Sequence, residues 1–89
     1  MSDASCTPVI IYSTRWCADC FRVKTFLRER GVPFEEIDIE SDPDAEDVVL
    51  RVNEGRRKVP TLKLGERYFA CSPFRAQKLA EELGIPLNR

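Results

Sequence analysis

Two cysteines separated by two residues, Cys17 and Cys20, are the side chains of this chain best suited to chemistry. They follow a short β-branched apolar run at residues 9–12 and open a long amphipathic stretch. At this spacing, two thiols at the start of a helix can reach each other and form a disulfide. The partial positive charge at the helix N-terminus favours the thiolate of Cys17, which is the reactive form of cysteine. The pattern therefore predicts thiol–disulfide exchange.

Length and composition limit the other classes of protein. The 89 residues suffice for one domain, and a hydrophobic content of 43% suffices for one compact core. The net charge of −1 gives no support to nucleic-acid binding, and no apolar run is long enough to cross a membrane. Because the first residues lack the pattern of a signal peptide, we expect a cytoplasmic protein, in which the four cysteines would not form two structural disulfides.

The chain contains no histidine, and this excludes several kinds of chemistry. It has no Cys–His nucleophile pair, no histidine ligand for zinc and no imidazole acid–base group. A zinc site is not expected either, because Cys6 and Cys71 lie far apart and do not repeat the CxxC spacing. We therefore expect no metal and no bound cofactor, and activation of a cysteine by a helix terminus and by Arg or Lys.

The elements around the two thiols must hold them in place. Residues 9–12 are expected to form a buried central strand, and a helix should run to about residue 30, with Gly31 after its end. Cys20 falls on the apolar stripe of this helix, whereas Cys17 lies at the edge of that stripe. The spacing predicts an accessible Cys17 and a more buried Cys20. The stripe consists of Cys20, Val23, Phe26 and Leu27.

The remaining pattern predicts an α/β domain of the order β-α-β-α-β-β-α. Two strands joined through a helix should be parallel, and a tight turn at Gly65-Glu66 predicts an antiparallel hairpin. Ser72-Pro73 signals the start of a third helix, which Gly84 ends. The later elements are a strand at 34–39, a helix after Ser41-Asp42-Pro43, and strands at 61–64 and 67–70. We expect a flexible arm at residues 1–8 and a single domain at residues 9–89, with a four-stranded mixed sheet flanked by three helices.

Two motifs carry a resemblance to the glutaredoxin family. Trp16-Cys17-x-x-Cys20 after the first strand and the Lys58-Val59-Pro60-Thr61 loop before the hairpin resemble glutaredoxins, and most of all their mycoredoxin branch. Segments 12–17, 36–40 and 52–61 resemble the same branch, and the match covers roughly residues 9–85. The resemblance implies a thioredoxin-like fold with a cis Pro60 beside Cys17. It also implies that the backbone groups of Val59 are free to pair with a substrate.

The sequence departs from the usual glutaredoxin pattern between the two cysteines. Glutaredoxins usually carry Cys-Pro-Tyr-Cys, whereas this chain has Ala18 and Asp19 at the two middle positions. The negative charge of Asp19 in the first helical turn helps the helix but opposes a neighbouring thiolate. We expect the thiolate of Cys17 to be favoured, but less than it would be between neutral residues.

A second departure concerns the small thiol that acts with the protein. Glutaredoxins that use glutathione carry Gly-Gly-x-Asp before the last helix, and the matching residues 70–73 are Ala-Cys-Ser-Pro. This disfavours glutathione and fits mycothiol, the thiol of the mycoredoxin branch, with bacillithiol as a further candidate. Basic residues would favour an anionic partner, although a solvated basic loop explains them as well. These residues are Arg15, Arg56, Arg57 and Lys58.

The motifs lead to specific roles for the site residues. We expect Cys17 to act as the nucleophile that attacks a mixed or protein disulfide, after which a small thiol or Cys20 resolves the adduct. The candidate substrate-binding residues are Arg15, Trp16, Lys58, Val59, Pro60, Cys71 and Ser72. Trp16 either walls the exposed sulfur or packs over the helix start. Cys71 either forms a regulatory or mixed disulfide or packs in the core as a small apolar residue. We favour packing in the core. No role is implied for Cys6, and a Cys6–Cys71 disulfide stays open.

Three other functions remain compatible with the sequence. One is a ribonucleotide-reductase-type redoxin reduced by a thioredoxin-type reductase, and another is a glutaredoxin that shares an iron–sulfur cluster between two chains. The third is a non-catalytic interaction module, which the presence of both cysteines disfavours. The expected partners are a low-molecular-weight thiol (mycothiol, bacillithiol or glutathione) and disulfide-containing proteins. We expect a monomer that binds neither nucleic acid nor membranes.

Overall fold

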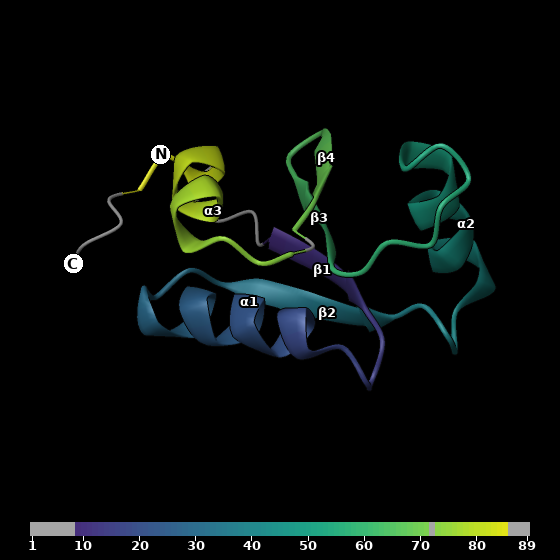
Figure 1. The fold of residues 1–89 in the computed structure, drawn as a ribbon, viewed down its shortest axis with the longest axis horizontal. Coiled ribbons are helices and arrows are strands. Elements are labelled where there is room, and N and C mark those ends of the chain that lie inside the picture. Colours follow the sequence, from purple (N-terminus) through teal and green to yellow (C-terminus); the bar gives the residue numbers. More distant parts are fainter. Residues whose placement is uncertain (1–8, 72, 86–89) are drawn as a thin grey trace.

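A mixed four-stranded sheet forms the centre of the computed structural model, which describes residues 9–71 and 73–85 (Figure 1). The strand order is β2-β1-β3-β4. The strands are β1 (Val9–Ser13), β2 (Phe34–Asp38), β3 (Thr61–Leu64) and β4 (Arg67–Ala70). β2 is parallel to β1, whereas β3 runs antiparallel to both β1 and β4. The predicted element order and mixed sheet are confirmed; the expected arm at residues 1–8 lies outside the described residues.

Three helices cover the two faces of this sheet. They are α1 (Ala18–Glu29), α2 (Pro43–Val52) and α3 (Ala76–Leu83). Figure 1 shows α2 and α3 on opposite sides of the β3–β4 hairpin. None of the helices in the described part of the chain has the length and apolar character needed to span a membrane.

The side chains of β1 divide the core into two clusters because successive strand residues point to opposite faces. Val9 and Ile11 pack with residues of α1 and α3, whereas Tyr12 packs with residues of α2. The larger cluster contains Val9, Ile11, Val23, Phe26, Leu27, Leu62, Cys71, Leu79 and Ala80. The sheet therefore holds α1, with the two thiols at its start, against the larger half of the core.

The ends of α1 follow the sequence signals closely. Gly31 has a φ of 70°, and the N–H groups of Gly31 and Val32 bond to the carbonyls of Arg28 and Leu27 at 3.2 and 2.9 Å. This pair of bonds is the Schellman arrangement, in which a left-handed residue satisfies the last carbonyls of a helix. The predicted end of the helix is confirmed, and the helix leaves the chain in position to enter β2.

The start of α3 differs from the prediction. Ser72-Pro73 was the expected signal, but α3 begins at Ala76 with Arg75 as its N-cap residue. Between them, Phe74 packs edge-on against Phe26 of α1, with ring centroids 6.0 Å apart. Arg75 itself is extended, with φ −136° and ψ 114°, so the helix begins about one turn later than expected.

Candidate active site

Cys17 is the N-cap residue of α1, with extended backbone angles of φ −94° and ψ 110°. Its Sγ accepts a hydrogen bond from the backbone N–H of Cys20 at 2.9 Å, and its carbonyl accepts one from Phe21 at 3.2 Å. The sulfur thus takes the place of the oxygen that usually caps a helix. An N–H group and the positive end of the helix dipole both face this sulfur, and both stabilise a negative charge on it.

Cys20 lies one turn later on the buried face of α1. It is 1% exposed, whereas Cys17 is partly exposed, so the predicted difference between the two thiols is confirmed. Burial raises the pKa of Cys20 to about 12; the hydrogen bond between the two thiols adds to the shift, and a backbone hydrogen bond at Thr14 opposes it. Of the two thiols, Cys17 can therefore be reached from solvent, whereas Cys20 is shielded and holds its proton.

The loop before β3 reaches the sulfur from the other side. The Val59–Pro60 peptide bond is cis, as the resemblance implied. The Cys17 thiol donates a long hydrogen bond of 3.6 Å to the Val59 carbonyl, and the N–H of Cys71 bonds to the Pro60 carbonyl at 2.9 Å. The structure therefore brings Val59 and Pro60 to Cys17, although they lie some forty residues further along the chain.

A buried polar relay fixes this loop, and the sequence analysis missed it. The side-chain amide of Asn53, at the end of α2, donates to the Thr61 hydroxyl at 3.1 Å. That hydroxyl donates in turn to the Lys58 carbonyl at 2.7 Å. Thr61 is 0% exposed, so its hydroxyl, which takes part in both bonds, is buried. A polar residue at a buried strand position was the signal that could have pointed to the relay.

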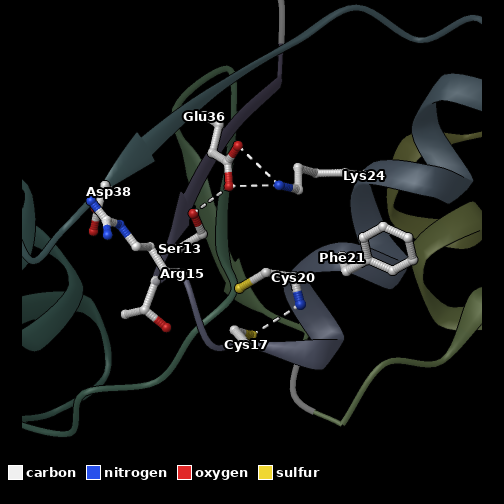
Figure 2. A pocket seen from close by; sticks show the side chains of 9 residues that line it. Ser13, Arg15, Cys17, Cys20, Phe21, Lys24, Glu36 and Asp38 are labelled. Carbon is white, nitrogen blue, oxygen red and sulfur yellow. Dashed lines mark hydrogen bonds and ion pairs between the residues drawn. The ribbon is translucent and has the colours of Figure 1, made fainter.

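A cavity of about 390 Å³ lies on the β2 side of the two thiols (Figure 2). On its wall, the Ser13 hydroxyl donates to the Glu36 carboxylate at 2.7 Å, and the Lys24 ammonium donates to both Glu36 oxygens at 2.9 and 3.0 Å. Burial alone raises the pKa of Glu36, but the bonds from Ser13 and Lys24 outweigh it and hold that pKa below its usual value. Sequence analysis missed this network because its three residues come from three elements.

Trp16 and the basic residues stand at the surface around the sulfur. Trp16 is 84% exposed, so the alternative in which it packs over the helix start is wrong. Arg15 and Lys58 are exposed, and neither forms an ion pair within the described residues. Arg57 differs, because it pairs with Glu46 at 3.0 Å and with Glu40 at 3.6 Å. Positive charge near Cys17 therefore comes from Arg15 and Lys58 more than from Arg57.

Cys71 is buried in the larger core cluster rather than facing the surface. It is a free thiol, 6% exposed, and burial, with a contribution from the Glu82 carboxylate, raises its pKa to about 11. This placement fits the packing interpretation. The predicted binding residue Ser72 lies outside the described residues, as does Cys6, for which no role was implied. Within the described residues, no three Cys, Asp or Glu side chains come together in a way that could hold a metal ion.

Comparison with known proteins gives consistent matches. The glutaredoxin family model matches residues 9–69. A Mycobacterium tuberculosis protein with glutaredoxin in its name is 43% identical over 63 residues, which are 71% of this chain and 75% of that protein. Mycoredoxin 1 of Corynebacterium glutamicum is 34% identical over 73 residues, covering 82% of this chain and 90% of the relative.

Two further matches broaden the comparison. The glutaredoxin-like protein NrdH of Lactococcus lactis is 34% identical over 73 residues, which are 82% of this chain and 96% of that protein. The crystal structure of a thioredoxin-like protein superposes with a TM-score of 0.76 at 28% identity, and the match covers 90% of this chain and 99% of the other. The fold predicted from the sequence is thus also the fold of solved relatives.

Proposed function

We propose that this chain, which belongs to the glutaredoxin family, is a thiol–disulfide oxidoreductase that reduces mixed disulfides between proteins and small thiols. Family membership supports the general activity. The finer assignment, with Cys17 as nucleophile and Cys20 as resolving thiol, rests on the geometry of this chain.

One observation carries the assignment. The sulfur of Cys17 caps α1 and accepts the Cys20 N–H at 2.9 Å, while the Cys20 side chain is 1% exposed. Exchange needs a first sulfur that is charged and reachable, and a second that stays protonated until the first has reacted. In this site, Cys17 is the reachable sulfur at the helix N-terminus, and Cys20 is the buried thiol that holds its proton.

The reaction proceeds in two exchanges. The Cys17 thiolate attacks the small-thiol sulfur of the mixed disulfide; a bond forms between those two sulfurs, and the substrate protein leaves as a thiolate that takes up a proton. A second small thiolate then attacks the adduct, releasing a small-thiol disulfide and the Cys17 thiolate. Alternatively, Cys20 loses its proton and attacks Cys17, which releases the small thiol and leaves a Cys17–Cys20 disulfide that requires two electrons from a reductant.

The small thiol is proposed to be mycothiol, with bacillithiol and glutathione as the compounds to compare. The similarity to a mycoredoxin and the absence of Gly-Gly-x-Asp at residues 70–73 support this choice. Exposed Arg15 and Lys58 would pair with an anionic group of the disulfide-containing protein rather than with mycothiol. Monomeric state and cytoplasmic location stay predictions.

Two matched variants test the roles of the cysteines. Cys17→Ser should abolish all exchange. Cys20→Ser should keep exchange that depends on a small thiol but stop direct reduction of protein disulfides, because it removes only the internal resolving thiol. Rates with mixed disulfides of the three small thiols, each with mass spectrometry of the adduct, measure both roles. Full dithiol activity in Cys20→Ser would refute the assignment of Cys20.

A second candidate is a redoxin of the ribonucleotide-reductase type that a thioredoxin reductase reduces. The similarity to a protein named NrdH favours it, and the same two cysteines would act. Turnover with thioredoxin reductase but none with any small thiol would establish this candidate instead. The iron–sulfur alternative stays a prediction, and the iron content of freshly purified protein tests it.

A further inference from the structure

Two exposed aromatic side chains lie next to the nucleophile. Trp16 is 84% exposed and Phe21 is 65% exposed, and no other large hydrophobic residue in the described part of the chain exceeds 38%. Both line one surface hollow of about 540 Å³ that also contains Cys17. Neither ring is needed for the core, since α1 buries a different stripe. Large apolar groups left in water beside a reactive atom mark a surface that a partner covers.

The charge around these rings is positive. Arg15 and Arg22 border the same hollow. Arg22 is neutralised by Asp19 at 3.1 Å, whereas Arg15 forms no ion pair within the described residues. Lys58 adds a second unpaired cation in the loop that contacts Cys17. The surface therefore complements a partner that is both apolar and acidic.

We propose that this aromatic surface, made of Trp16 and Phe21 and bordered by Arg15, docks a polypeptide substrate with an apolar side chain and an acidic residue close to its disulfide cysteine. The inference rests on the proposed function and names the substrate class of the same site. Aromatic residues and Arg are enriched at protein interfaces, where a few such side chains carry most of the binding energy. A small polar thiol offers little apolar surface to cover both rings.

The docked substrate reacts by the exchange already described. The apolar side chain packs against Phe21 and Trp16, and the acidic residue pairs with Arg15. The Cys17 thiolate bonds to the small-thiol sulfur, and the polypeptide leaves as a thiol after it takes up a proton. The surface thus orients the polypeptide as the leaving group and leaves the chemistry at Cys17 unchanged.

Model disulfides of one design test the proposal. Three peptides carry a cysteine linked to 2-mercaptoethanol: one with Glu and Phe beside it, one with Glu and Ser, and one with Lys and Phe. Bis(2-hydroxyethyl) disulfide is the small substrate. The wild type should have its highest kcat/KM with the Glu–Phe peptide. Phe21→Ser should lower kcat/KM for that peptide about tenfold and should lower kcat/KM for bis(2-hydroxyethyl) disulfide clearly less. Val52→Ser, at an apolar residue 38% exposed on α2, is the matched control and should change neither rate.

Charge reversal gives the second arm of the test. Arg15→Glu should invert the preference, so that the Lys–Phe peptide becomes the better substrate, and added salt should weaken both preferences. Equal losses for peptide and small substrate in Phe21→Ser, or no inversion in Arg15→Glu, would overturn the docking proposal. A wild type that fails to reduce bis(2-hydroxyethyl) disulfide with any small thiol would overturn the proposed function instead.

Discussion

Replacing Thr61 tests whether the buried relay holds the loop beside Cys17. Thr61→Val changes the hydroxyl to a methyl group of similar size, so the volume of the buried site is kept. It removes the acceptor of the Asn53 amide, 3.1 Å away, and the donor to the Lys58 carbonyl, 2.7 Å away. Valine is at least as favourable as threonine in a strand, so strand propensity does not oppose the change.

The size of the effect follows from the two groups that lose a partner. Leaving one buried donor or acceptor unsatisfied costs about 1–3 kcal/mol. The Asn53 amide keeps a second bond to the Val49 carbonyl at 2.8 Å, which limits its share. Thr61→Val should therefore lower the free energy of unfolding by about 2–4 kcal/mol. Thr61→Ser keeps the hydroxyl and loses one methyl group, which costs about 1 kcal/mol.

Urea unfolding of the wild type and the two variants at neutral pH measures these differences. The rate of disulfide exchange should also be highest in the wild type and lowest in Thr61→Val. The bond from Thr61 to the Lys58 carbonyl holds the loop at Lys58, and the carbonyl of the next residue, Val59, contacts Cys17. If Thr61→Val does not fold, Asn53→Ala serves in its place; it removes the first bond of the relay together with the bond from Asn53 to the Val49 carbonyl. A valine variant as stable as the wild type, or a serine variant as unstable as the valine variant, would refute the reasoning.

Three other predictions concern neighbouring elements. Ser13→Ala should raise the pKa of Glu36 towards its ordinary 4.5. The wild type should therefore be more stable than the variant above pH 4.5, and this difference should shrink as the pH falls below 4.5. Urea unfolding of both proteins at a series of pH values measures the difference. Asp42→Ala removes the N-cap of α2 and should cost about 1 kcal/mol in thermal or urea unfolding, whereas Asp44→Ala, which does not supply the N-cap, should cost less. Cys71→Ala should keep the exchange rate, and a loss as complete as that of Cys17→Ser would show that this buried thiol takes part in the reaction.

The sequence predicts the elements well where local physics decides them. Glycine with a positive φ ends α1, the turn at Gly65-Glu66 closes the hairpin, and α2 begins at Pro43 after Ser41-Asp42, all as expected. The predicted start of α3 was wrong: the residue Phe74, just before the helix, packs against Phe26, which lies almost fifty positions earlier. Such a contact depends on the assembled fold, which local signals do not contain.

The same division applies to the site. The different exposure of Cys17 and Cys20 follows from helical periodicity, and it was predicted correctly. The bonds from Lys24 to Glu36 and from Asn53 to Thr61 were not predicted. Each bond joins residues from two elements. The sequence contains many other charged or polar residues that could equally have been the partners.

Selective alkylation tests the central claim, that Cys17 alone among the three cysteines of the described chain is ready to react. Burial raises the pKa of Cys20 to about 12 and that of Cys71 to about 11, so both thiols stay almost entirely protonated at pH 7.5. Reduced protein is treated with limiting iodoacetamide at that pH and digested with trypsin, and fragmentation of the peptide 16–22 separates its two cysteines. The account predicts that Cys17 is labelled many times faster than the other two. Labelling of Cys20 or Cys71 at the rate of Cys17 or above it would contradict the account.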